Sequence, residues 1–203
     1  MKINEHTLEE WLDAIYPLCM NAKASYFYCE YLYNPHTKEE AEFINDSRHF
    51  RHISHSLFRI LIIDLAKLVN HENSNDMFSF PKLFKFLKTL DMVGEKAERI
   101  KALEVDFYQY DVLIKSILTL RNKLYAHSDQ AKMNFEAMNV TFPNLLSLID
   151  CLCKTLQEIA YITMDWELVF HAYFNQQERL LWDDFRTLVY ARKLRRRGRL
   201  KRH

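Results

Sequence analysis

Residues 110–127 read YDVLIKSILTLRNKLYAH, and apolar side chains recur in this run every three or four positions. That spacing is typical of one buried face of an α-helix. Its apolar members are Leu113, Ile117, Leu120 and Leu124. The run closes on RNKLYAH, which places Arg121 and His127 six positions apart. We therefore predict a long helix with a polar sequence of chemical interest at its end.

The composition predicts the same class of structure for the whole chain. Its 203 residues include only 2 glycines and 4 prolines, and 49% of them are hydrophobic. Few helix breakers and many helix formers favour long helices joined by short turns, and the regular turn signals of a β-protein are missing. We predict an all-α bundle of four long helices with a short extra helix. Residues 1–175 would form the helical domain, and residues 176–203 an amphipathic C-terminal helix with a basic tail.

Helix boundaries can be proposed from caps and turn formers. Thr7 and Thr37 stand where N-caps are expected, and Glu40 completes a capping box with Thr37. The predicted helices cover about 7–33, 38–70, 82–90 and, with a break whose place the sequence does not fix, 95–108. The RNKLYAH helix follows, then a helix from Thr141 through Tyr161 with a pattern extending to Phe174. The stretch 176–199 is amphipathic.

Neither a membrane span nor a metal site is predicted. The longest apolar run, 60–69, includes Asp64 and Lys67 and is about half the length of a span, and the first ten residues lack a signal pattern. The 4 cysteines lack the spacing of metal ligands or of a disulfide framework. We expect a cytoplasmic protein with reduced thiols and no cofactor.

Charge is distributed unevenly. The formal net charge is +1, but residues 191–203 contain eight Lys or Arg and no acid, which leaves +1 − 8 = −7 for the rest. In a helical tail, Arg195, Arg196 and Arg199 would share one positive face. The tail fits RNA contact, contact with an acidic partner, or a disordered end.

A second cationic segment, residues 48–59, reads RHFRHISHSLFR. Helical spacing places Arg48, His52, His55 and Arg59 on one face with Arg51 beside it. Such a face could follow an RNA backbone or could simply be solvated. A metal site at His52 and His55 lacks a third ligand. Asp64, further along, either faces the surface or is buried and pairs with Arg121 or Lys67.

Helix geometry constrains how Arg121 and His127 could act together. Six residues of regular helix correspond to a rise of about 9 Å and a rotation of about 120°, so the two side chains flank the apolar seam that contains Leu124. Two routes would bring them together. The helix could end at Ala126 so that His127 turns back, or two copies could pack along the Leu124 seam and share a cleft.

With Arg121, Asn122 and His127, the segment LRNKLYAHSD resembles the motif of HEPN domains, in particular the abortive-infection subgroup of bacterial phage defence. The resemblance also covers the layout of helices. It implies a homodimer that cleaves RNA without a metal, through attack of the ribose 2′-OH on the adjacent phosphate. His127 would be the general base or acid, Arg121 would stabilise the developing charge, and Asn122 would hydrogen-bond and orient His127 or the phosphate. Lys123 could bind phosphate and Asp129 could steer His127.

We therefore predict a ribonuclease that acts in phage defence or in a toxin–antitoxin system, with RNA as substrate and an antitoxin protein as a possible partner. The alternatives are an inactive HEPN scaffold and an RNA-binding protein that uses its basic tail. Arg and His near the C-terminus of a helix also interact favourably with the helix dipole, so the motif has a purely structural explanation as well.

Overall fold

The computed structural model describes residues 6–71, 78–90, 92–126, 140–170, 183 and 186–191. Over this part of the chain the structure is helical with connecting loops and contains no strand. The all-α prediction is confirmed. Seven helices of eight or more residues are described: α1 (Leu8–Tyr33), α2 (Lys38–Asn45), α3 (Arg48–Val69), α4 (Phe80–Leu87), α5 (Glu95–Tyr108), α6 (Asp111–Ala126) and α7 (Phe142–Met164).

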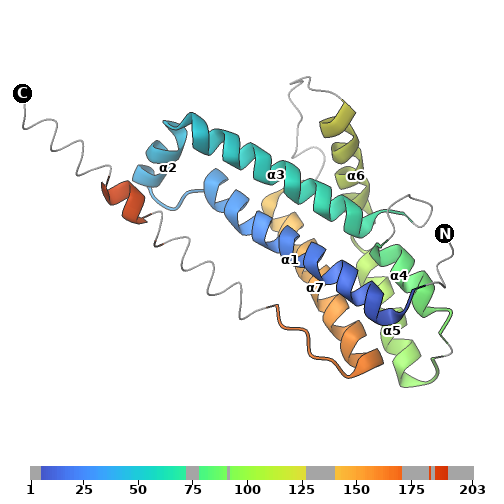
Figure 1. Cartoon of the computed structure of the whole chain (residues 1–203). Coiled ribbons are helices and arrows are strands. Elements are labelled where there is room, and N and C mark those ends of the chain that lie inside the picture. The colour runs from blue at the N-terminus through green and yellow to red at the C-terminus, as the bar shows by residue number, and fades with distance from the viewer. Residues whose placement is uncertain are drawn as a thin grey trace, which may run out of the picture.

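The long helix α1 is central to the bundle (Figure 1). It packs against α3 on one side and α7 on the other, while α6 packs on α3 and α5 on α7. One large apolar core joins these helices, and a smaller cluster of Tyr31, Leu32 and Ile44 fills the space between α1, α2 and α3. Large aromatic side chains are completely buried in the main core. They include Trp11, Phe80, Phe84, Phe107 and Phe170.

Both predicted N-caps are present. The Thr7 hydroxyl accepts a hydrogen bond from the Glu10 backbone N–H at 3.2 Å, and the Glu10 carboxylate accepts one from the Thr7 N–H at 2.8 Å. Thr37 and Glu40 form the same reciprocal pair at the start of α2. Each box satisfies two backbone N–H groups that the first turn of a helix leaves unpaired.

The single helix predicted over 38–70 is wrong, because the chain breaks it into α2 and α3. The break falls at Asp46 and Ser47. The Ser47 hydroxyl accepts a hydrogen bond from the Phe50 N–H at 3.4 Å and so caps α3. Asn, Asp and Ser compete for backbone hydrogen bonds and favour caps and turns, and Asn45-Asp46-Ser47 is a run of these residues.

The predicted extension of the last long helix to Phe174 is also wrong. Helix α7 ends at Met164, and Asp165 adopts the left-handed conformation with φ 56° and ψ 33°. The Asp165 N–H donates to the Tyr161 carbonyl at 3.2 Å and the Trp166 N–H to the Ala160 carbonyl at 3.3 Å, which closes the end of the helix. The chain then packs back on the core, where Gln157 donates to the Leu168 carbonyl at 2.6 Å and Phe170 is buried.

Little of the predicted C-terminal helix lies within the described residues. Residues 186–191 are helical. Burial raises the pKa of Tyr31, and the positive charge of Arg186 opposes that rise, which places Arg186 close to the end of α1. The basic residues 192–203 lie outside the described part of the chain. None of the described helices combines the length and the hydropathy needed to cross a membrane.

Candidate functional site at the end of α6

Helix α6 carries the first half of the RNKLYAH motif and is anchored by its apolar face. Leu113, Ile114, Ile117, Leu118 and Leu120 are all buried. The opposite face, with Val112, Lys115, Thr119 and Asn122, is exposed. Packing against α3 therefore holds the last described turns of α6 on a rigid support.

Contact between two copies along the apolar seam was one of the two routes that would bring Arg121 and His127 together, and the first part of this seam is internal. Leu113 is 4% exposed, and Ile117 and Leu120 are completely buried in the core of a single chain. The Leu124 side chain lies outside the described residues. A second copy therefore cannot pack along Leu113, Ile117 and Leu120, and any dimer that includes the motif must use a different surface.

Arg121 and Asn122 are hydrogen-bonded to each other. Arg121 is partly buried and Asn122 is exposed. The Arg121 Nε–H donates to the Asn122 Oδ1 at 3.3 Å. This bond uses the carbonyl end of the amide, so Asn122 points its NH₂ group away from the guanidinium. Lys123 is exposed on the next position.

His127 and Asp129 lie outside the described residues, since the description of α6 extends to Ala126. The distance between Arg121 and His127 is therefore not defined. A turn after Ala126 stays a prediction, and a contact between two copies stays one only away from Leu113, Ile117 and Leu120. The structure does define the setting of Arg121 and Asn122.

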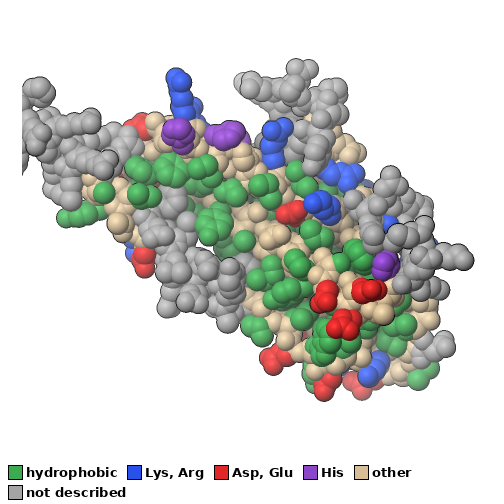
Figure 2. Space-filling view, in the orientation of Figure 1, with side chains coloured by type: hydrophobic (Ala, Val, Ile, Leu, Met, Phe, Trp, Pro, Cys, Tyr) green, Lys and Arg blue, Asp and Glu red, His purple; other side chains and the backbone are tan. Residues whose placement is uncertain are grey.

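The second cationic segment lies on the exposed side of α3. We call Arg48, Arg51, His52, His55 and Arg59 the Arg–His row. All five side chains are exposed. Figure 2 shows Lys, Arg and His side chains gathered along the edge of the molecule that α3 forms. The Tyr33 hydroxyl and His55 Nδ1 form a hydrogen bond of 3.0 Å, which fixes the ring of His55 against α1.

The chain was then compared with known proteins. A family model described as HEPN AbiU2 matches residues 5–182. The chain belongs to the AbiU2 family of HEPN proteins. This confirms the resemblance seen in the motif, including the abortive-infection subgroup. Neither the curated proteins nor the solved structures contain a match to the chain.

The HEPN match includes α1 to α7, the motif and the Arg–His row, but not the basic tail. Arg195, Arg196 and Arg199 lie beyond residue 182, outside both the family match and the described residues. The candidate site of this HEPN chain must therefore be built from α3, α6 and the residues that follow α6.

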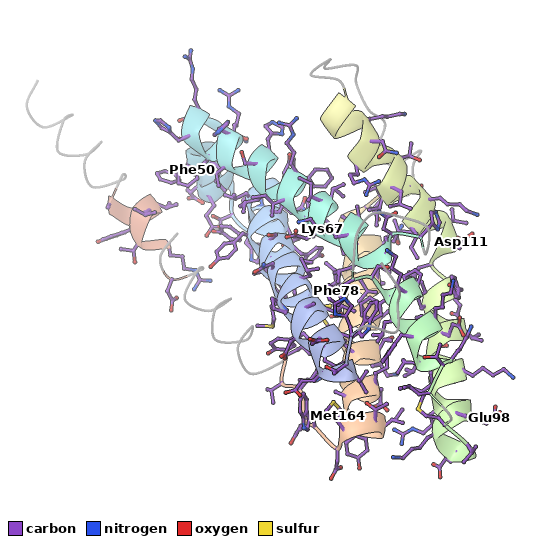
Figure 3. The ribbon with its side chains drawn as sticks, turned by 45° about the vertical axis from the view of Figure 1, so that its right-hand side comes forward. Phe50, Lys67, Phe78, Glu98, Asp111 and Met164 are labelled. Carbon is purple, nitrogen blue, oxygen red and sulfur yellow. The ribbon has the colours of Figure 1, made fainter. Side chains whose placement is uncertain are left out.

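Helices α3 and α6 converge where α3 ends and α6 begins, and from there they run back in opposite chain directions (Figures 1 and 3). A cavity of about 350 Å³ opens at this junction, which sequence reasoning did not anticipate. Residues from four neighbouring segments line it: Val69, His71, Pro81, Phe107, Tyr108, Asp111 and Ile114. Val69 of α3 and Ile114 of α6 both line this cavity, so the first turns of α6 lie beside the end of α3.

Asp64 is the buried acid of α3, and its partner is Lys67. The residue is 8% exposed, and the Lys67 Nζ lies 3.5 Å from its Oδ1. Figure 3 labels Lys67 on α3. Desolvation raises the pKa of the Asp64 carboxyl, and Lys67 opposes this rise. The sequence left open whether Asp64 faces the surface or is buried, and whether it pairs with Arg121 or Lys67. The structure shows that Asp64 is buried and pairs with Lys67.

Among the described residues, His, Cys, Asp and Glu form no cluster that could hold a metal ion. All four cysteines are free thiols. Cys29 is buried, and burial raises its pKa to about 12. A thiol with so high a pKa is a poor nucleophile at neutral pH, so Cys29 contributes to packing.

Proposed function

We propose that this HEPN protein is a metal-independent endoribonuclease that acts in defence against phage or as the toxin of a toxin–antitoxin pair. In the reaction, the ribose 2′-oxygen attacks the adjacent phosphorus and the bond from phosphorus to the 5′-oxygen breaks. One proton leaves the 2′-OH and one is gained by the 5′-oxygen. The products are a 2′,3′-cyclic phosphate and a 5′-hydroxyl end.

Each residue of the motif has a separate task in this reaction. His127 moves the protons, since histidine exchanges protons near neutral pH. Arg121 binds the phosphate oxygens and stabilises the charge that develops on them. Asn122 holds the guanidinium through its carbonyl oxygen. Lys123 adds a positive charge on the exposed side of the same turn.

The observation that carries the proposal is the setting of Arg121 on α6. The helix below it is fixed by five buried side chains, and its Nε is bonded to Asn122. A phosphate-binding group on a packed helix loses little entropy when it binds, which is what preorganised catalysis requires. The family match over residues 5–182 supports the same function.

Cleavage of single-stranded RNA by the purified chain in EDTA tests the proposal. We expect the wild type to cleave, and Arg121→Ala and His127→Ala to lose at least about 100-fold in rate. Lys101→Ala and His36→Ala remove an exposed cation and an exposed histidine elsewhere and should cleave normally. Cleavage that depends on a divalent ion, or that survives His127→Ala, would contradict the mechanism.

Growth arrest on expression distinguishes a toxin from a HEPN scaffold without activity. The wild type should arrest growth, His127→Ala should not, and an antitoxin encoded nearby should relieve the arrest. Equal arrest by both would favour the scaffold.

The eight cations of the tail favour a second candidate, an RNA-binding protein that works through residues 191–203. Deleting that segment should then abolish RNA binding and its salt dependence whatever residue is at position 121. Binding that persists without the tail would exclude this candidate.

A further inference from the structure

The Arg–His row is a stretch of α3 that carries positive charge without compensation along the helix. From Ser47 to Ile63 there is no carboxylate in the sequence. The acid before this stretch, Asp46, ends α2, and the acid after it, Asp64, is buried beside Lys67. In the described part of the chain, neither Arg48 nor Arg51 forms an ion pair. Arg48 and Arg51 therefore present their charge to solvent, and the Arg59 side chain is exposed as well.

Like α4 and α7, α3 has no acid in its first turn, and this turn carries two arginines. Acids occupy the first turns of α1, α2, α5 and α6, whereas α3 has no acid there and has Arg48 and Arg51 instead. The N-terminal end of a helix is positive, so cations at this end cost stability. A local rule broken in this way is expected where a residue serves binding.

An exposed aromatic ring lies beside the row. Tyr33, at the end of α1, is 42% exposed. Its ring stands nearly perpendicular to the ring of His55, at 80° and 6.1 Å between centroids. Cations beside exposed rings are the combination that binds single-stranded nucleic acid, because phosphates pair with cations and bases stack on rings. An acidic peptide would use the cations but not the rings.

The row also connects two places that matter for the proposed function. One end, Arg59, is the member of the row nearest in sequence to the end of α3 that meets α6, the helix that carries Arg121. The other end, Arg48, follows α2, and Arg186 close to Tyr31 brings the start of the C-terminal segment to the same end of the molecule. From Arg48 to Arg59 the helix is about 16 Å long, enough to contact several consecutive phosphates.

We propose that the Arg–His row binds the backbone of single-stranded RNA and guides it toward Arg121. The proposal rests on the proposed ribonuclease function for the identity of the polymer and for the direction in which it leads. Arg48, Arg51 and Arg59 pair with phosphates, and Tyr33 offers its ring to a base.

The test measures binding with a probe that the protein cannot cleave. Fluorescence anisotropy follows a fluorescein-labelled 12-mer of 2′-O-methyluridine, which lacks the attacking 2′-OH, with the full-length chain. The row variant is Arg48→Gln, Arg51→Gln and Arg59→Gln. The control is Lys96→Gln, Lys101→Gln and Lys154→Gln, which removes the same charge from exposed positions of α5 and α7.

We expect the row variant to bind at least tenfold more weakly than the wild type, and the control to bind within twofold of it. The slope of log K against log salt should fall by about 2 in the row variant, from three lost phosphate contacts at about 0.7 each. Equal losses of RNA affinity in the row variant and the control would overturn the proposal. The net charge of the protein, rather than the position of the cations on α3, would then determine binding. The proposal would also be overturned if the row variant bound the RNA probe like the wild type and lost affinity only for a poly-glutamate peptide. The row would then bind an acidic protein.

Cleavage of unmodified RNA separates this proposal from the proposed function. If both hold, the row variant raises KM and retains most of the wild-type kcat. If the wild type does not cleave RNA but the row variant loses RNA binding, the proposed ribonuclease function is wrong and the proposed RNA-binding role of the row is supported. If the wild type cleaves and the row variant binds and cleaves like it, the row fails alone.

Discussion

The bond between Arg121 and Asn122 makes the amide a positioning group for the guanidinium. The bond ties the Nε of Arg121 to its neighbour at the partly buried end of α6. We expect Asn122→Ala to lower kcat for RNA cleavage by up to about 100-fold, which is the cost of a misplaced catalytic group. The thermal midpoint should not change, because Asn122 is exposed.

The matched control for Asn122 is Thr119→Ala, one turn earlier on the same exposed face. The Thr119 hydroxyl donates only to the Lys115 carbonyl within α6. Its loss should leave kcat unchanged. A lower kcat in both variants would indicate damage to the helix rather than to the pair, and an unchanged Asn122→Ala would remove Asn122 from the site.

Asp64 should make the folded state less stable as its carboxyl ionises. Burial raises its pKa in the folded state, so the folded state binds more protons than the unfolded state between the two pKa values. Stability contributed by this group is therefore present at low pH and is lost as the pH rises through the folded pKa. We expect the free energy of unfolding of Asp64→Asn, relative to wild type, to increase from about pH 3.5 to pH 7.

Urea denaturation at several pH values measures that difference. Asp150→Asn is a suitable control, because Asp150 is an exposed acid whose partner is Lys23 at 3.0 Å. Removing it should give no such increase with pH. A difference for Asp64→Asn that shrinks as the pH rises would show that Lys67 outweighs desolvation.

At the scale of the element, the first turn of α3 should respond to charge in opposite ways in stability and in binding. Replacing Arg48 and Arg51 with Glu puts acids where the helix dipole favours them. Each change should stabilise the fold by roughly 0.3–1 kcal/mol at low salt while RNA affinity falls. Thermal unfolding and anisotropy on the same sample check both signs, and a double variant that is less stable than wild type would mean that the arginines are structural.

Local signals predicted several elements well. The Thr37 capping box and the N-cap at Thr7 could be taken from the sequence, because each depends on residues a few positions apart. The helix over 95–108 is also present, but the break expected within it is not. The run Asn45-Asp46-Ser47 also indicates a break in the helix. The long apolar pattern that follows it favoured one continuous helix over 38–70 instead.

The remaining differences depend on contacts between distant parts of the chain. Helix α7 stops at Met164, where the chain turns back to bury Phe170 and to pair Leu168 with Gln157. The seam of α6 shows the same limit. Apolar residues spaced three and four positions apart predict that Ile117 and Leu120 are buried. This spacing does not show whether α3 or a second copy buries them.

At the scale of the whole molecule, the position of the seam changes how a dimer could form the site. The stripe from Leu113 to Leu120 is occupied by the core, so a partner copy must approach the exposed side of α6 or the residues after Ala126. A dimer built in this way can still combine Arg121 of one copy with His127 of the other. Breaking such a dimer should then abolish cleavage as completely as removing His127.

A mixed dimer tests whether the site is shared. Arg121→Ala and His127→Ala chains, each inactive alone, are co-expressed with different tags, and the heterodimer is purified through both tags. If each site takes its arginine and its histidine from different copies, one of the two sites has both residues and the other has neither. The heterodimer should then recover about half of the wild-type rate per dimer. If each site lies within one copy, every site lacks one residue, and the heterodimer should be as inactive as its parents.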